Sequence, residues 1–209
     1  MGRMKRLLFV LACASTAMAA TVTLTMTEVP AQAIDGLVVT KGGITFTFSD
    51  AGGGLFYNAP STGNRTYVQD PSIGGPPEPF GIVFSPPVNF IQFAMSGGPP
   101  VPPGTLLASV KFYNGAALLA TVALNASLTD PYPEGQLTFT PATQVTSITV
   151  TPATGFGAIG FDNLLVTPIP PPIPSAPVSS PLTLALMTLG IAGLAGYALR
   201  RRFGPSPIY

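Results

Sequence analysis

The side chains of this chain that are suited to acid–base chemistry are its carboxylates. They are Glu28, Asp35, Asp50, Asp70, Glu78, Asp130, Glu134 and Asp162. Nearly all of them lie next to glycine, proline or polar residues, as residues of solvated turns do. A glycosidase would need two of them on opposite sides of one bond, at a separation that a sequence does not give. We therefore expect a protein that is not an enzyme, and keep a carboxylate hydrolase as the third hypothesis.

Asp162 and Asn163 differ from the other polar residues because they interrupt an apolar, strand-like segment, "IGFDNLLVT" from Ile159. Two interpretations are open. The pair forms a bulge or strand-edge feature whose side chains bond nearby backbone groups, or it supplies oxygen ligands to a calcium ion or a sugar. We favour the bulge. Calcium is the one cofactor candidate, and Tyr57, Tyr67 and Tyr132 would stack on sugar rings if they are exposed.

Other reactive side chains are scarce. Histidine is absent and Cys13 is the only cysteine. Because Cys13 lies in a segment that we expect to be removed, the mature protein would have no thiol for a disulfide, a nucleophile or a metal site. Between the two ends the basic residues are Lys41, Arg65 and Lys111, against eight acidic residues. Nothing there would neutralise phosphates, so nucleic acid is not an expected partner.

The central part of the chain reads as a series of strands. Apolar and polar residues alternate in "TVTLTMT" from Thr21 and in "ITFTFS" from Ile44, with the period of two of a half-buried strand. "LLASVKFYNGAALLATVAL" predicts a hairpin with Asn114-Gly115 at its turn. Further strands are expected from Phe80, Val88, Gln136, Val145 and Ile159. The expected fold of residues 20–166 is an all-β, antiparallel β-sandwich of jelly-roll type.

The amino end predicts a secretory signal peptide over residues 1–19. Arg3, Lys5 and Arg6 precede the apolar "LLFVLACASTAMA". Ala17 and Ala19 are the small residues that a signal peptidase reads, so the secretion machinery and signal peptidase are expected partners. The alternative is a lipoprotein-type site in "VLAC", ending at Cys13.

The carboxyl end predicts a membrane anchor. Residues 167–181, "TPIPPPIPSAPVSSP", form a proline-rich spacer. Residues 182–199 are apolar and, as a helix, would reach roughly 27 Å, enough for a bilayer core. Arg200, Arg201 and Arg202 then begin a basic cytoplasmic tail, residues 200–209. By the positive-inside rule the arginines stay in the cytoplasm, so we expect a chain anchored in the inner membrane with its ectodomain outside the cytoplasm.

The order of signal peptide, threonine-rich β ectodomain, proline-rich spacer, short span and arginine cluster resembles bacterial surface proteins with a PEP-CTERM-type sorting signal. The resemblance is clearest in "LTLALMTLGIAGLAGYALRRR" from Leu182. The Pro-Glu-Pro of that family is missing, and "PIPSAPVSSP" stands in its place. The resemblance implies processing by an exosortase-like membrane enzyme and delivery to the cell surface or to an extracellular polysaccharide matrix.

Two main hypotheses for the function follow. The first is an exported, non-catalytic surface or matrix protein with a structural or adhesive role, sorted or anchored by its tail. The alternative is a carbohydrate-binding module presented on a membrane stalk. Extracellular polysaccharide is a candidate partner in both.

Overall fold

The computed structural model describes residues 20–60, 66–128 and 132–169. The chain divides into two units, Met1–Pro170 and Pro171–Tyr209, and all the described residues lie in the first. Their regular structure consists of strands, without a helix, and the strands pair antiparallel. The all-β antiparallel prediction is therefore confirmed. Among these residues no helix has the length and apolarity needed to cross a membrane, and the predicted span at 182–199 lies outside them.

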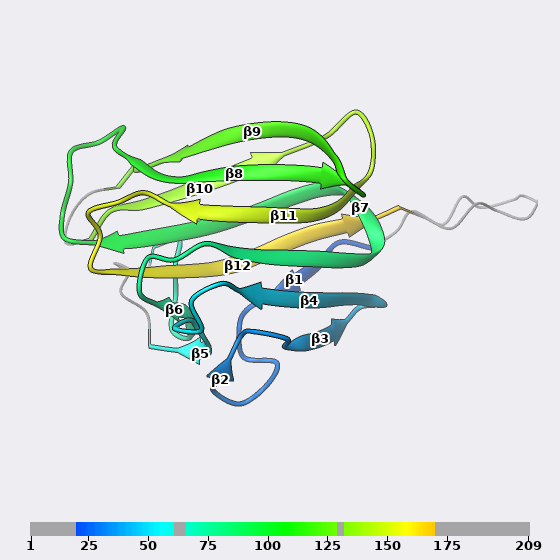
Figure 1. Ribbon diagram of the computed structural model, residues 1–209, viewed down its shortest axis with the longest axis horizontal. Helices are drawn as coiled ribbons and strands as arrows, with labels where there is room; N and C mark the ends of the chain where they lie inside the picture. The colour runs from blue at the N-terminus through cyan, green and yellow to red at the C-terminus, as the bar shows by residue number, and fades with distance from the viewer. Residues whose placement is uncertain (1–19, 61–65, 129–131, 170–209) are drawn as a thin grey trace, which may run out of the picture. The chain divides into compact units, whose positions relative to one another are not determined.

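The described residues form twelve strands (Figure 1). They are β1 (Val22–Leu24), β2 (Gln32–Ala33), β3 (Val38–Lys41), β4 (Ile44–Asp50), β5 (Phe56–Ala59), β6 (Ser72–Gly75), β7 (Phe80–Gly98), β8 (Leu106–Asn114), β9 (Ala117–Asn125), β10 (Glu134–Phe139), β11 (Val145–Pro152) and β12 (Ala158–Pro168).

The long strand β7 belongs to two layers. Residues 80–85 pair with β4 on one side, and residues 80–83 pair with β11 on the other. Residues 91–96 pair with β10 and, on the opposite side, with β12. Pro86 and Pro87 lie between the two halves, where neither can donate a backbone hydrogen bond. The strand thus passes from one layer to the other at the prolines.

The first layer, called here the six-stranded layer, has the order β3-β4-β7-β11-β8-β9. The second layer has the order β10-β7-β12, and β12 continues to β6, β5 and β2 at one end and to β1 at the other. Ring contacts join the layers: Phe112 of β8 stacks on Phe139 of β10, with ring centroids 3.9 Å apart. Phe80 of β7 meets Phe161 of β12 edge to face at 5.2 Å. The two layers therefore enclose one core, as in a β-sandwich.

Three details differ from the sequence prediction. The strands expected from Phe80 and from Val88 are one continuous strand, because β7 changes partners at the prolines without ending. The hairpin loop is Gly115-Ala116, one residue later than expected, since Asn114 still pairs with Ala117. Gly115 takes the positive φ, +57°, that a tight turn needs. β12 continues through Thr167 and Pro168, into the segment assigned to the spacer.

Candidate functional site

Asp162 and Asn163 form a β-bulge in β12. The register between β12 and β7 shifts after Asp162, and Asn163 has a positive φ of 53°. The Gln69 backbone N–H donates to Asp162 Oδ2 at 2.9 Å, and Asn163 Nδ2 donates to the Tyr67 carbonyl at 2.7 Å. Both side chains thus bond backbone groups, as the favoured interpretation required, and they hold a segment about ninety residues away in the sequence.

That segment, residues 66–69, crosses the outer face of the second layer. Glu134 Oε2 on β10 accepts the Tyr67 backbone N–H at 2.7 Å, while Asp162 on β12 holds Gln69. The side chain of Val68 is buried and lies 3.1 Å from the place of a Cβ on Gly160. Two buried carboxylates therefore secure the backbone of the segment, and a valine fills the space over a glycine between them.

Three oxygens under the 66–69 segment make no hydrogen bond: Ser72 Oγ, Ser96 Oγ and Asp162 Oδ1. The two hydroxyls lie 2.6 Å (Ser96) and 3.5 Å (Ser72) from the place of a Cβ on Gly160, so they border the same small space. Burial raises the pKa of Asp162 to about 6, although the backbone N–H groups of Gln69 and Asn163 oppose the shift. The chemistry suits a donor such as water, or a cation.

The unpaired oxygens are the main structural feature that favours the predicted calcium site at Asp162 and Asn163. Within the described part of the chain, no three side chains of the acidic, histidine or cysteine type come together as a metal-binding group would. Asn163 donates through Nδ2 to the Tyr67 carbonyl, and Asp162 accepts the Gln69 N–H through Oδ2, which leaves Asp162 Oδ1 without a hydrogen-bond partner. Calcium normally takes six to eight oxygens, more than the side chains of Asp162 and Asn163 supply, so calcium binding stays a prediction.

Three other carboxylates hold a glycine-rich turn at residues 51–54. Asp50 Oδ2 accepts the Leu55 N–H at 2.9 Å, and Glu78 Oε1 accepts the Gly54 N–H at 2.7 Å. Asp35 Oδ1 accepts the Asp50 N–H at 3.2 Å. These are charge-assisted hydrogen bonds to the backbone. These three carboxylates lie close together, and their role in the fold is to stabilise this turn.

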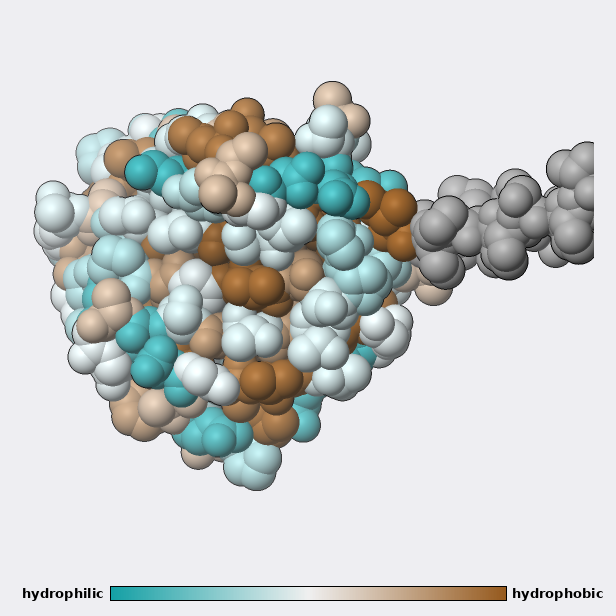
Figure 2. Space-filling view, turned by 45° about the vertical axis from the view of Figure 1, so that its right-hand side comes forward, coloured by the Kyte–Doolittle hydropathy of each residue, from teal (hydrophilic) through white to brown (hydrophobic). Residues whose placement is uncertain are grey.

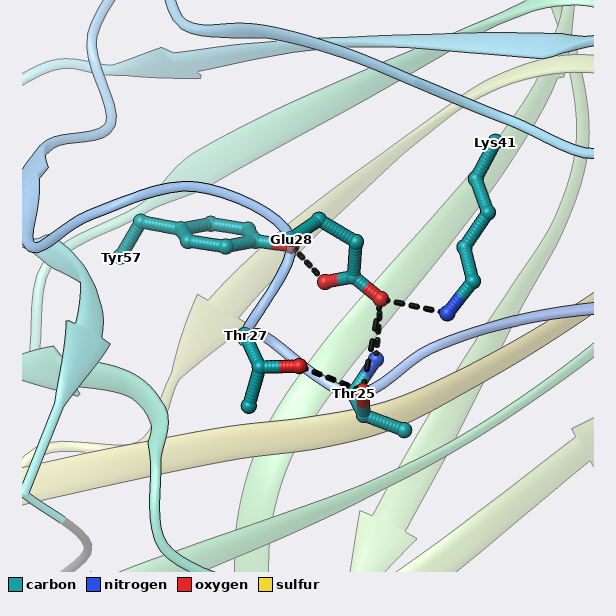
Figure 3. Close-up of polar contacts among 5 residues, drawn as sticks. All are labelled: Thr25, Thr27, Glu28, Lys41 and Tyr57. Carbon is teal, nitrogen blue, oxygen red and sulfur yellow. Dashed lines mark hydrogen bonds and ion pairs between the residues drawn. The ribbon is translucent and has the colours of Figure 1, made fainter.

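Glu28 joins the loop after β1 to both layers (Figure 3). Its carboxylate accepts hydrogen bonds from Lys41 Nζ on β3 at 2.7 Å and from the Tyr57 hydroxyl on β5 at 2.5 Å. The Thr25 backbone N–H donates to it at 3.0 Å. Burial alone would raise the pKa of Glu28, but these donors lower it to about 2. Burial and the Glu28 carboxylate together raise the pKa of Tyr57. This is a structural ion pair that the sequence analysis did not anticipate.

The predicted sugar-stacking tyrosines have different environments. Tyr57 is fully buried, with its hydroxyl on Glu28, so the idea that it stacks on sugars is wrong. Tyr67 is half-buried in the 66–69 segment. Tyr132 is 40% exposed and its ring lies 3.6 Å from the place of a Cβ on Gly98, over the outer face of the second layer.

The outer face of the six-stranded layer carries a row of side chains that runs across all six strands. Directly paired residues point to the same face of an antiparallel sheet, so the ladder registers define the row. It is Val38, Thr47, Val83, Ser147, Tyr113 and Leu118. Val38, Val83 and Leu118 are half or more exposed, at 54%, 50% and 54%. Apolar and hydroxyl side chains alternate over most of this row.

A second row lies beside the first, two residues along each strand except β9, where a bulge makes the step three residues. It consists of Ser49, Gly81, Thr149, Lys111 and Thr121, so Lys111 is its single charge. Because Gly81 has no side chain, a shallow pocket of about 180 Å³ opens there, lined by Ser49, Ala51, Pro79, Phe80, Gly81 and Thr149. None of these lining residues is a carboxylate. These two rows offer contact area, hydroxyl groups and one lysine, without a carboxylate.

The remaining predicted site residues lie outside the described residues. These are the cleavage residues Ala17 and Ala19 and the topology residues Arg200, Arg201 and Arg202, together with Asp130 and Cys13. Their assignments stay predictions.

Comparison with known proteins gives only distant likenesses. No protein-family model and no curated protein matches the chain. Among solved structures, a family 29 carbohydrate-binding module mutant in complex with mannohexaose is similar at 12% identity and a TM-score of 0.33, covering 71% of this chain and 92% of that chain. The enzymatically active domain of tailspike protein 4 of bacteriophage CBA120 is similar at 13% identity and a TM-score of 0.31, covering 69% and 20%. Likenesses of this strength assign neither a family nor a function.

Proposed function

We propose that the protein is an exported, non-catalytic surface or matrix protein that adheres through the outer face of its six-stranded layer. The observation that carries the proposal is the row from Val38 to Leu118, because three of its side chains are large, apolar and half or more exposed. Exposed apolar side chains aligned across one face of a sheet favour its use as a contact surface. The neighbouring row adds hydroxyl groups and one charge.

The use of the carboxylates supports a role without catalysis. Glu28, Asp50, Glu78, Glu134 and Asp162 each accept a hydrogen bond from a backbone N–H group of the fold. A general acid or nucleophile must instead face a substrate, in a cleft wide enough to hold it. The third hypothesis, a carboxylate hydrolase, therefore has no observation in its favour.

Export and anchoring are part of the proposal and rest on the two chain ends. Residues 1–19 would direct secretion, and residues 182–202 would hold the chain in the membrane or mark it for an exosortase-like enzyme, as the resemblance to sorting signals implies.

Changing Arg200, Arg201 and Arg202 together to alanine tests the anchor. The preceding span contains Gly190, Gly193 and Gly196, so its insertion is weakly favourable and retention should depend on the positive charge that follows. We expect more of the mutant chain to pass across the membrane. A tag after Tyr209 would become accessible to external protease. The same retention and the same tag protection in both proteins would show that the arginines do not stop transfer.

A second candidate function, carbohydrate binding, is favoured by the chemistry of the same row. Tyr113 and the apolar side chains can lie against the C–H faces of sugar rings, while Thr47 and Ser147 between them can bond hydroxyl groups. The two candidate functions differ in whether a soluble oligosaccharide competes with the polysaccharide for the protein. A soluble oligosaccharide should release a carbohydrate-binding module from a polysaccharide but leave a general adhesin attached.

The variant Val83→Glu tests the face. It places a carboxylate at the middle of the row, where contact with another surface would bury it without a partner, so we expect adhesion to fall by roughly tenfold or more. Val83 is 50% exposed, so folding should be little affected. The matched control is Phe56→Glu, at a residue 47% exposed on β5 of the other layer. Retention of cells or beads carrying the full chain on matrix polysaccharide is the measurement. Equal retention of the wild-type protein and Val83→Glu would refute the assignment of this face.

A further inference from the structure

β9 is an open edge of the six-stranded layer. Within the described residues it pairs with β8 alone, and it forms the upper margin of the fold in Figure 1. Its nine residues, "ALLATVALN", include no charge and no proline. The opposite edge strand, β3, has four residues and ends in Lys41. Soluble proteins normally protect an edge with charge, proline, shortness or a bulge. Of these β9 has only a bulge near its start, before Ala120.

At the β9 edge of the sandwich, some side chains that pack on the core are partly exposed. Leu119, Ala120 and Val122 of β9 pack on the core but stay partly exposed, as does Phe139 on β10, the edge strand of the other layer. Figure 2 shows hydrophobic surface along the upper margin, where β9 lies in Figure 1. An unpaired backbone edge and an apolar strip thus coincide.

We propose that β9 pairs antiparallel with β9 of a second copy of this chain. An antiparallel pair of identical strands is related by a twofold axis, so both edges are satisfied at once and the assembly closes as a dimer. The six-stranded layers of the two copies would then form one continuous sheet, with two copies of the adhesive row side by side. The inference rests on the edge and holds whether or not that row is adhesive.

The register of this pairing follows from the regular part of β9. Phe112 of β8 pairs with Ala120 of β9, but the next residue, Tyr113, pairs with Leu118. Leu119 is therefore an extra residue, and the regular pairing of β9 with β8 begins at Ala120. It runs to Leu124, and its centre is Val122. With Val122 on the twofold axis, Ala120 faces Leu124 of the other copy. A small residue then opposes a large one on the core side, which suits close packing.

Charge also favours a second copy at this edge. The described residues contain more acidic than basic side chains, so two copies carry the same net charge and repel each other. β9 carries no charge, and Lys111, which pairs with Thr121, lies one strand further in. Pairing of the two β9 edges therefore brings no like charges of β9 itself together.

Single cysteines test the pairing in the full-length chain in membranes of producing cells, with Cys13→Ser so that no native cysteine remains. Val122→Cys would place two sulfurs across the axis, because directly opposed Cα atoms lie about 4.5 to 5.5 Å apart, within disulfide range. Ala120→Cys is the matched control on the same face of the same strand. Its two copies would be offset by four residues, about 14 Å, which is out of range. Val38→Cys, on the opposite edge strand, reports random collision.

Under mild oxidation we expect a disulfide-linked dimer in the majority of Val122→Cys chains and in few chains of the two controls. Adding the exposed substitution Thr121→Lys to Val122→Cys should remove most of the dimer, since it puts two like charges beside the axis. If Val122→Cys yields no more dimer than Val38→Cys, or if Thr121→Lys leaves the dimer unchanged, the proposal is wrong. Protection of the Val122→Cys thiol from labelling without a dimer would mean that something other than a second copy covers β9, and would also overturn it.

Discussion

The variant Glu28→Gln is expected to unfold with a free energy lower than that of the wild-type protein at pH 7 by up to about 3 kcal/mol, less what solvent takes from the pair with the partly exposed Lys41. The pKa of Glu28 is lowered from 4.5 to about 2, and each pKa unit corresponds to about 1.4 kcal/mol of preference for the charged form in the fold. Lys41 and Tyr57 both donate to this carboxylate. An amide would leave the cation without its counter-charge and the buried hydroxyl with a weaker acceptor. Urea unfolding followed by circular dichroism measures the difference.

The pH dependence of this effect has a defined sign. Because the pKa is depressed in the folded state, the stabilisation is fully present above pH 4.5 and is lost as the pH falls towards 2. Wild-type protein and Glu28→Gln should therefore approach each other in stability as the pH is lowered through this window. The control is Thr27→Ala, in the same loop, whose hydroxyl contacts only that of Thr25 and should matter by less than about 0.5 kcal/mol. Equal stabilities of the wild-type protein and Glu28→Gln at pH 7 would contradict the argument.

The parts of the fold that the sequence predicts correctly are those with a local pattern. β4 follows from strict alternation over seven residues, and the β8–β9 hairpin follows from alternation with a glycine at its turn. β2 and β6 have two and four residues, too few to show a period, and half of β6 is glycine. They are strands because β5 and β12 supply their hydrogen bonds. Such pairings depend on the tertiary structure and leave no local trace.

The residues of the candidate site likewise divide into those with a local signal in the sequence and those without one. Asp162 could be found because it is polar within an apolar strand, but its partner Gln69 lies 93 residues away and carries no signal of its own. Glu28 has the sequence context of a solvated loop residue, because the sequence does not show that Lys41 and Tyr57 both donate to its carboxylate. The exposed row across the six-stranded layer takes one residue from each of six strands, so it exists only once the register is known.

The second large effect is expected at Asp162, with the opposite sign. Burial raises its pKa from 3.8 to about 6, so ionising it in the fold costs up to about 3 kcal/mol at pH 8. Stability of the wild-type protein should therefore increase as the pH falls from about 7 to 4. Asp162→Asn removes the cost and keeps an oxygen for the Gln69 N–H. We expect this variant to be more stable than the wild-type protein at pH 8 and about equal to it below pH 4.

The same variant decides between the two interpretations of Asp162. A calcium ion would hold the carboxylate ionised, so its removal by a chelator would lower the unfolding temperature of the wild-type protein, and Asp162→Asn would destabilise the fold at pH 8. A purely structural carboxylate predicts no effect of the chelator and a gain of stability in the variant. The matched control is Asp50→Asn, which also changes a buried carboxylate that accepts a backbone N–H but lies at the glycine-rich turn. Because no third acidic side chain joins Asp162 within the described residues, we expect the structural outcome.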